Sequence, residues 1–398
     1  LDSESQLTRR AAINVSEHGV VTPKWSHWVA SETPTLELAG FATAERLRLR
    51  FDDDLASAPQ IERHAALPGT TAAVALADHT LLAANPLLDG WLRLGPGDRV
   101  ALDRVDDPRD DRSFEERLGE ALVFTTAMAP WNRAEGPRSR FTCETCHFEG
   151  RGDGRTHFTG RERDGQRVHA TSKPLLGLFP NRPYFSRALD RSMAQMVDNE
   201  FRVANRHSGR DPWFVLGDAD LPWLRELVGW PGEVDGEQLR RALMAFLQRF
   251  SMPSNPAAHG RDRFTDLERS GAAVFAATCE GCHRARVVSD DPSTQIDFAD
   301  WEALILSSNG PIVWASADYV ATEIEPRVHA DGARVPSLRR LWLKSPYFTN
   351  GSAQQLDALL ASVRRTAAGV THGAGPIPPE QQLDAHEREA LAAFLQLL

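Results

Sequence analysis

Two five-residue segments of the chain, Cys143–His147 and Cys279–His283, have the same pattern, CxxCH. In this pattern the two thiols attach covalently to the vinyl groups of a porphyrin, and the adjacent histidine binds its iron as the proximal ligand. The sequence therefore predicts two c-type haems, one on each segment. These segments are called the first and the second pentad below.

A zinc site or disulfide bonds would explain the two CxxCH segments less well than haem attachment does. The pentads contain all four cysteines of the chain, and a zinc site would need four Cys or His ligands packed together, whereas the pentads lie far apart in the sequence. A disulfide within each pair would not explain why a histidine follows both times. The predicted haem attachments and their iron-binding histidines are Cys143, Cys146, His147, Cys279, Cys282 and His283.

The composition is that of an ordinary globular protein, with 398 residues, 41% hydrophobic and 25% charged, enough for two or three domains. A net charge of −10 argues against nucleic acid or an anionic membrane surface as a partner. No apolar run approaches the ~20 residues that a membrane span needs. Because the chain begins at Leu1 rather than Met, we expect a signal peptide to have been removed or to lie outside this sequence. Covalent haem attachment in bacteria normally follows export, so we expect a periplasmic or otherwise exported protein.

Residues 1–110 have the pattern of a β domain. Apolar and polar residues alternate at strand period, and glycine- or aspartate-containing turns recur between the alternating runs. The predicted strands are Leu47–Phe51, Thr71–Leu76, Thr80–Ala84 and Gly90–Leu94. A charged linker, Asp106–Arg112, is predicted to end this domain.

The rest of the chain repeats one plan twice. A helix precedes each pentad, from Phe114 to about Thr126 and from Asp266 to Ala277, and Ser113 with Glu116 forms a capping-box pattern at the start of the first. A second amphipathic helix ends each repeat, at Gly236–Phe250 and at Glu380–Leu398. The proline-rich join Met252–Pro256 separates the halves. The predicted fold is therefore an N-terminal all-β region, 1–110, followed by two tandem, mainly α cytochrome c-like haem domains, 113–255 and 256–398.

Three further segments make the chain resemble the bacterial di-haem cytochrome c peroxidases and their MauG-type relatives. They are Lys173–Phe179, Val335–Arg339 and Ser345–Gly351, and the resemblance covers about residues 114–398. It implies that the first haem reacts with hydrogen peroxide while the second passes electrons to it. The β region resembles the last blades of propellers fused to such domains. Since about 110 residues make only two or three blades, either a second polypeptide completes a partial propeller or the region is a β-sandwich.

The resemblance implies a methionine as sixth ligand of the second haem, but all five methionines precede the second pentad. Val363 falls near the position of that methionine. The first choice of replacement is His372, the second His329 and the third Tyr319, whereas we expect His386 to be exposed on its helix. Because imidazole stabilises ferric iron better than a thioether does, a histidine ligand predicts a low reduction potential.

For the first haem, alignment with the family places Phe185 at its bridging tryptophan, Gln195 at its glutamine and Asn205 at its glutamate. Glu200 is the nearest carboxylate, and we predict it, with Gln195, as the catalytic pair. A carboxylate in an apolar pocket has a raised pKa, which suits a base that moves a proton during cleavage of peroxide. The alternative is that Glu200 pairs with an arginine such as Arg202 on a solvated helix face.

A histidine after the first pentad is expected to cap the first iron, and the candidates are His157, His169 and His207. Calcium is a further cofactor typical of the family, although Val335 departs from the family's pattern at a segment associated with it.

The predicted function is a periplasmic di-haem oxidoreductase of the peroxidase/MauG type, using peroxide and acting with a redox partner protein or on a protein or unusual organic substrate. The alternative is a non-catalytic electron-transfer cytochrome, one subunit of a larger complex, in which a histidine binds the first iron permanently.

Overall fold

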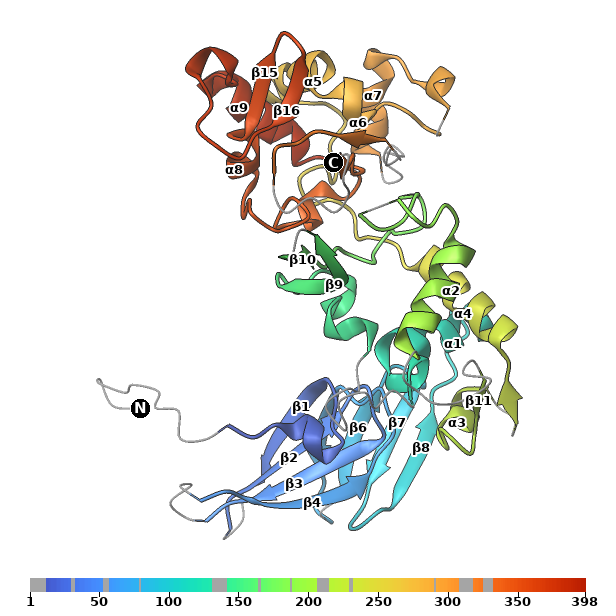
Figure 1. Ribbon diagram of the computed structural model, residues 1–398. Coiled ribbons are helices and arrows are strands. Elements are labelled where there is room, and N and C mark those ends of the chain that lie inside the picture. The colour runs from blue at the N-terminus through green and yellow to red at the C-terminus, as the bar shows by residue number, and fades with distance from the viewer. Residues whose placement is uncertain are drawn as a thin grey trace. The chain divides into compact units, whose positions relative to one another are not determined.

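The computed structural model describes residues 12–29, 33–52, 57–78, 80–130, 142–163, 166–186, 188–205, 215–228, 232–289, 291–307, 318–324 and 332–398. The chain divides into two compact units, described separately here (Figure 1). Unit 1 comprises Leu1–Thr145 and Asp198–Phe246, and unit 2 comprises Cys146–Val197 and Leu247–Leu398. The units divide the predicted first haem domain between them, and the three-domain division at 1–110, 113–255 and 256–398 stays a prediction.

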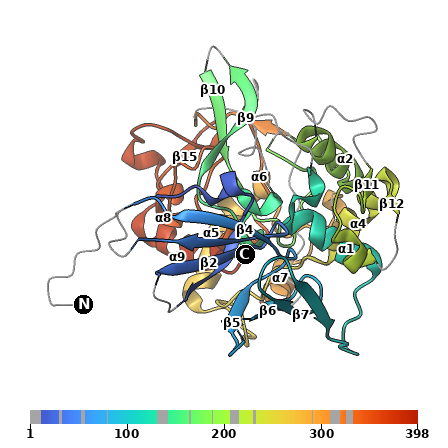
Figure 2. The same ribbon diagram turned by 90° about the horizontal axis from the view of Figure 1, so that it is seen from below.

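The N-terminal region of unit 1 is all-β, as predicted, and contains two four-stranded antiparallel sheets (Figures 1 and 2). The first consists of β1 (Pro23–Val29), β2 (Thr35–Gly40), β3 (Glu45–Arg50) and β4 (Gln60–Ala65), and the second of β5 (Ala72–Ala75), β6 (Leu81–Asn85), β7 (Gly90–Leu94) and β8 (Val100–Arg104). Each sheet is an up-and-down meander in which neighbours in sequence are neighbours in space. The four predicted strands coincide with β3, β5, β6 and β7 to within two residues.

Alternation along the strands builds a core for each sheet. In β3, Leu47 and Leu49 are buried, whereas Arg48 and Arg50 lie on the other face. Polar contacts join the two sheets, because the Trp25 indole N–H of β1 donates to the Ala73 carbonyl of β5 at 3.2 Å. The buried guanidinium of Arg46 pairs with Glu37 at 2.9 Å and also donates to the Gly95 carbonyl after β7.

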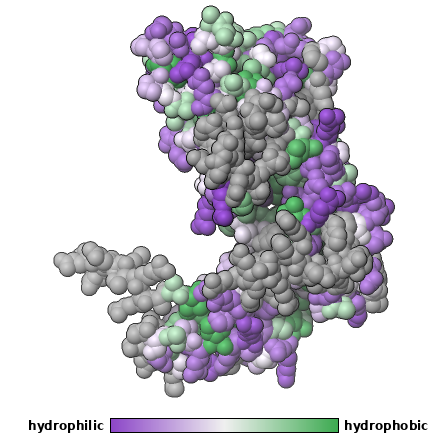
Figure 3. All heavy atoms as spheres, in the orientation of Figure 1, coloured by the Kyte–Doolittle hydropathy of each residue, from purple (hydrophilic) through white to green (hydrophobic). Residues whose placement is uncertain are grey.

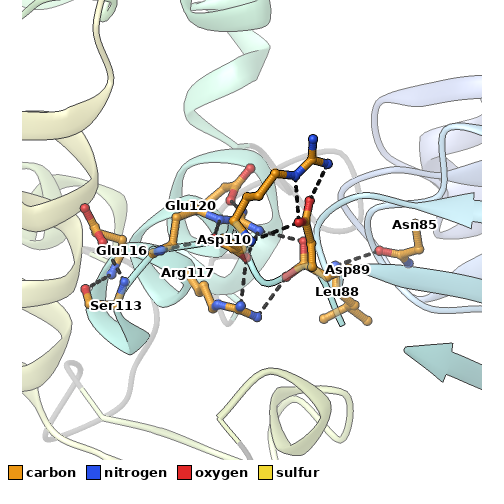
Figure 4. A network of polar contacts seen from close by, with 11 residues as sticks. Asn85, Leu88, Asp89, Asp110, Ser113, Glu116, Arg117 and Glu120 are labelled. Atoms are coloured by element: carbon orange, nitrogen blue, oxygen red, sulfur yellow. Dashed lines mark hydrogen bonds and ion pairs between the residues drawn. The ribbon is translucent and has the colours of Figure 1, made fainter. Parts of the chain in front are cut away.

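The predicted linker is a charged junction rather than a simple spacer. Arg112 forms ion pairs with Asp89, Asp110 and Glu120 at 2.6–2.8 Å, and Arg117 shares both aspartates (Figure 4). Asp89 lies in the β6–β7 turn, and Glu120 and Arg117 lie on α1 (Phe114–Phe124). The network therefore ties the second sheet to the first helix.

The helices confirm the predicted repeat. Ser113 and Glu116 form the expected capping box at α1, and Thr265 with Glu268 forms another at α5 (Asp266–Thr278). The paired helices are α4 (Gly236–Arg249) and α9 (Ala385–Leu395). The last of these begins later than expected, because Pro379–Gln381 forms a separate 3₁₀ turn and Asp384 caps the helix.

The remaining elements are short and belong mostly to hairpins and connecting helices. They are α2 (Met193–Ala204), α3 (Leu224–Val228), α6 (Glu280–His283), α7 (Phe298–Leu306) and α8 (Leu356–Leu360), with the two-stranded pairs β9 (Thr156–Arg163) and β10 (Gln166–Thr171), β11 (Leu216–Gly217) and β12 (Glu233–Val234), β13 (Tyr319–Val320) and β14 (Ala333–Arg334), and β15 (Val363–Thr366) and β16 (Gly369–His372). In unit 2, Phe275 of α5, Trp301 of α7 and Phe394 of α9 form an aromatic core, with ring centres 4.8–5.8 Å apart.

Each helix pair crosses at a glycine. A Cβ atom at Gly119 of α1 would overlap the carbonyl oxygen of Ala242 on α4, and one at Gly271 of α5 would overlap that of Ala390 on α9. The two crossings are thus equivalent, which is structural support for an internal duplication.

We expect Gly119→Ala and Gly271→Ala each to lower the free energy of unfolding by about 1–3 kcal/mol, because the added methyl group forces the helices apart. Gly375→Ala is the matched control, since a Cβ there meets no heavy atom within 4 Å. Urea denaturation followed by circular dichroism measures all three. Equal stability of the Gly271 and Gly375 variants would contradict the close crossing.

No helix in the described part of the chain is long and apolar enough to cross a membrane. On the face shown in Figure 3, hydrophilic residues cover much of the described surface and apolar ones occur in small groups between them.

Candidate haem-binding site

The first pentad begins in unit 1 as a 3₁₀ turn, Cys143–Thr145. The thiol of Cys143 lies 3.5 Å from the sulfur of Met128. Glu144 is 1% exposed, and its carboxylate pairs with the Lys24 ammonium of β1 at 2.6 Å. A strand far away in the sequence therefore supplies the charge that allows this part of the pentad to be buried.

His147, the histidine of the first pentad, is held by a backbone carbonyl. Its Nδ1 lies 2.7 Å from the oxygen of Lys173, and because a carbonyl only accepts, Nδ1 must carry the proton. Burial lowers the pKa of His147, which favours the neutral ring. A neutral imidazole with Nδ1–H fixed in this way has Nε2 free for a metal.

The second pentad repeats this arrangement in unit 2. His283 ends α6, and its Nδ1 lies 3.3 Å from the carbonyl oxygen of Pro336. Burial lowers its pKa to about 4, so the ring is neutral at ordinary pH. Glu280, which follows the first cysteine as Glu144 does, pairs with Arg286 at 2.6 Å.

Burial favours the protonated form of two of the pentad thiols. Burial raises the pKa of Cys279 to about 12 and also raises that of Cys146. None of the four cysteines is in a disulfide.

His372 faces the proximal histidine of the second pentad. The ring centres of His283 and His372 are 6.3 Å apart and the ring planes are inclined by 75°. Two imidazoles that bind one metal ion from opposite sides, at about 2.0 Å per bond, have ring centres roughly 6 Å apart. Nδ1 of His372 lies 3.3 Å from the hydroxyl of Ser362, which leaves its Nε2 free. Burial lowers the pKa of His372 to about 4, so this ring is neutral too. The pair fits an iron between two imidazoles.

The hairpin β15–β16 explains how a histidine reaches this position. Val363, which the resemblance aligns near the family's methionine, pairs directly with His372 across the hairpin. Val363 is 3% exposed and belongs to the core, whereas His372 is the last residue of β16. The side chain near His283 is therefore His372 of β16, and not the residue at position 363 of β15.

The segments that carry the resemblance pack together around these histidines. The Lys173 ammonium donates to the carbonyls of Pro346 at 2.6 Å and Phe348 at 3.2 Å. The Phe348 ring lies against His372, with ring centres 5.5 Å apart. One lysine therefore connects the backbone that orients His147 with the segment that packs on His372.

The other candidate ligands lie in different surroundings. His157 pairs with Asp153 at 2.9 Å, and its Nδ1 is 3.8 Å from the thiol of Cys146. His169 is exposed, and so is His386, as expected. Tyr319 is half-buried in the β13–β14 pair opposite Arg334. His207 and His329 lie outside the described residues.

The predicted catalytic pair lies on α2. Gln195 is exposed, and its side-chain oxygen accepts from the backbone N–H of Arg191 at 3.2 Å. Glu200 is half-buried and lies on the helix face of Met196 and Val197, both of which are in the core. The two side chains therefore point to different sides of the helix, and their catalytic roles stay a prediction.

Asn205 and Phe185, which the resemblance aligns with the family's glutamate and bridging tryptophan, lie in different environments. Asn205 is 3% exposed, and its amide donates to the carbonyl of Met128 at 2.9 Å. Phe185, at the family's bridging position, is 43% exposed. Among the described residues no group of three or more His, Cys, Asp or Glu side chains is placed to hold a metal ion, and calcium stays a prediction.

Sequence reasoning did not identify Lys173, Pro336, Ser362 or Lys24 as supporting residues. A signal existed for the first two, since both lie in the segments that carry the resemblance, in Lys-Pro and Val-Pro pairs. Nothing in the sequence marks Lys24, because its partner Glu144 is distant along the chain, or Ser362, because it lies in a turn before β15.

No family model matches the chain, and no curated protein matches it in sequence. Among solved structures, it is similar to a MauG-like protein associated with microbial copper homeostasis, at 18% identity and a TM-score of 0.43, covering 74% of this chain and 92% of that one. It is also similar to Kuenenia stuttgartiensis hydrazine synthase, at 15% identity and a TM-score of 0.39, covering 76% of this chain and 98% of that one. At these scores the likeness is too slight to assign fold or function, which are argued from the residues.

Proposed function

We propose that the protein is a di-haem c-type oxidoreductase, with peroxide chemistry at the first pentad and electron transfer at the second. The two CxxCH pentads support the pair of cofactors, and the facing rings of His283 and His372 are the observation that carries the division of roles. A c-type haem supplies a redox-active iron whose sixth position either admits a small ligand or is filled by the protein.

At the second pentad, His283 and His372 are the residues that would hold the haem iron. Their Nδ1 atoms are held by the Pro336 carbonyl and the Ser362 hydroxyl, so both rings keep one orientation. Two imidazoles stabilise the ferric state, which favours a low-potential electron-transfer site over a ligand-binding one.

At the first pentad, the Lys173 carbonyl orients His147 as the proximal ligand. Glu200, on the buried face of α2, is the proposed base that accepts and returns a proton during cleavage of peroxide, and Gln195 is the proposed second polar group.

The proposed setting is the periplasm or another exported location. We propose that the first haem oxidises a protein or organic substrate, or that a redox partner protein supplies the electrons that reduce it. Because the β region consists of two blade-like meanders, a second polypeptide that completes it is part of the proposal.

A second candidate is a non-catalytic electron-transfer cytochrome. It is favoured by the contact between His157 and Cys146, which keeps a second imidazole beside the first pentad. If that imidazole fills the sixth position permanently, both haems only transfer electrons.

Electron paramagnetic resonance of the ferric protein, with and without peroxide, tests the choice. A pyridine haemochrome assay first counts the covalent haems, and we expect two per chain. We then expect one low-spin signal from the second haem and a high-spin signal from the first that changes when peroxide or cyanide is added.

The double variant Cys279→Ala/Cys282→Ala serves as the control for assignment, since it removes the second haem and should leave the peroxide-sensitive signal. Two low-spin signals that do not change on addition of peroxide or cyanide would support the non-catalytic electron-transfer cytochrome instead.

A further inference from the structure

Four cationic side chains gather in unit 2 between the segments that orient the two proximal histidines. They are Lys173, Arg334, Arg340 and Lys344, and a fifth cation, Arg339, lies next to Arg340 and Lys344. The Lys173 ammonium lies 3.4 Å from the Lys344 carbonyl, and the Arg340 guanidinium donates to the carbonyl of Pro174, next to Lys173, at 2.6 Å. We call these four side chains the cationic cluster.

None of the four forms an ion pair with a carboxylate in the described part of the chain. Arg340 is 3% exposed, and its Nε is buried without a hydrogen-bond partner. Nε and Nη1 of Arg334 are buried and unpartnered in the same way. Burial lowers the pKa of Lys173 to about 8, that of Arg340 to about 9 and that of Arg334 to about 10.

Lys344 has the most cationic surroundings of the four. Its residue is partly exposed, yet burial of the ammonium lowers its pKa well below the usual value, and the charges of Arg340, Arg334 and Lys173 lower it further. A buried cation without a counter-charge has a high desolvation free energy, and native proteins offset it with an acidic side chain or a bound anion. This cluster therefore has the electrostatics of an anion site.

The cluster lies beside both pentad histidines. Arg340 is close enough to His147, and Lys344 close enough to His283, for each cation to lower the pKa of its neighbouring histidine. The backbone completes the link, since Lys173 provides the carbonyl for His147 and Lys344 donates to the carbonyl of Ser337, next to Pro336. The cluster therefore lies close to the histidines that would hold a porphyrin on each pentad.

We propose that Arg334, Arg340 and Lys344 bind carboxylates, and that these carboxylates are the propionates of the haems. This inference rests on the proposed di-haem function. Each haem has two propionate groups, so two haems would bring negatively charged carboxylates to a cluster of cations. The unpartnered nitrogens of the two arginines donate to carboxylate oxygens, which are their strongest partners.

Lys173 has a different role in the cluster. Its ammonium already donates to three carbonyls, those of Lys344, Pro346 and Phe348, so it contributes charge rather than a free donor. A shared cationic cluster places the propionates of both haems in one electrostatic environment. Loss of one cation is therefore expected to lower the reduction potentials of both haems, because the ferric state gains a neighbour of net negative charge.

Resonance Raman spectroscopy of the holoprotein tests the assignment, because the bending modes of haem propionates shift with their hydrogen bonding. The variants are Arg334→Gln and Lys344→Gln. If one of them does not fold, the spectrum of the other tests the proposal. Arg269→Gln is the matched control, an exposed arginine of the same unit whose partner is Glu302 at 2.8 Å. We expect the propionate modes to shift and both potentials to fall in the two variants and to stay unchanged in the control.

Acetate titration of the same proteins separates the two sources of carboxylate. If propionates fill the cluster, acetate has no saturable effect on the potentials of the parent protein. Saturable acetate binding that is lost in Arg334→Gln would assign the cluster to a free carboxylate and overturn the proposal, and so would unchanged propionate modes in both variants. A chain without covalent haem in the haemochrome assay would instead overturn the proposed function.

Discussion

Replacing His372 with methionine is expected to raise the reduction potential of the second haem by roughly 0.1–0.3 V, a fraction of the ~0.8 V range that axial ligands cover. The reason is the loss of one of two imidazoles, which stabilise ferric iron better than a thioether does. Methionine is flexible enough to reach the same iron from β16. Spectroelectrochemical titration of the parent and variant proteins measures the change.

The outcome depends on the facing geometry of His283 and His372, whose ring centres are 6.3 Å apart. His386→Met is the matched control, because it makes the same substitution at an exposed histidine of unit 2 and should leave both potentials unchanged. A potential that stays the same in His372→Met, together with an unaltered low-spin signal, would mean that another residue binds the second iron.

The substitution Lys24→Met is expected to lower the free energy of unfolding by about 3 kcal/mol, near the low end for a broken buried ion pair. It leaves the Glu144 carboxylate without its partner, although the Glu144 side chain is 0% exposed. The Lys24 ammonium also lies 4.6 Å from the ring centre of Phe41, and that contact is lost as well. Chemical denaturation followed by circular dichroism gives the value.

A double-mutant cycle separates the charge effect from packing. Glu144→Gln alone should cost less, because Lys24 is 22% exposed and its ammonium can be solvated. The double variant Lys24→Met/Glu144→Gln should regain part of the stability lost in Lys24→Met, since it leaves no buried charge. If the double variant is the least stable of the three, the pair is not the source of the effect.

Several features followed from the sequence because they depend on neighbours along the chain. The CxxCH spacing alone predicts haem attachment, and the capping box at Ser113 depends on a residue three positions away. The alternation in β3 and the repeat of α1 and α5 are equally local. The structure has the capping box, the strand and the two helices where the patterns indicate them, and haem attachment stays a prediction.

Other features needed the fold. The sequence offered three candidates for the sixth ligand of the second haem, and only the β15–β16 register shows that His372 reaches the face of His283. Gln195 and Glu200 are close in sequence, yet the turn of α2 points them to different sides. Composition could not reveal the cationic cluster either, since arginines and lysines are ordinarily solvated.

The sequence by itself therefore predicted which residues attach haem, and it indicated the repeated helices around the pentads and the β region that precedes them. The tertiary structure decided which side chains surround each pentad: Lys24 beside Glu144, His372 near His283, and a cationic cluster with Arg340 near His147 and Lys344 near His283. The physical reason is the range of the interactions. Covalent attachment and helix capping act over a few residues, whereas ligand pairing and charge compensation act through space between segments that only folding brings together.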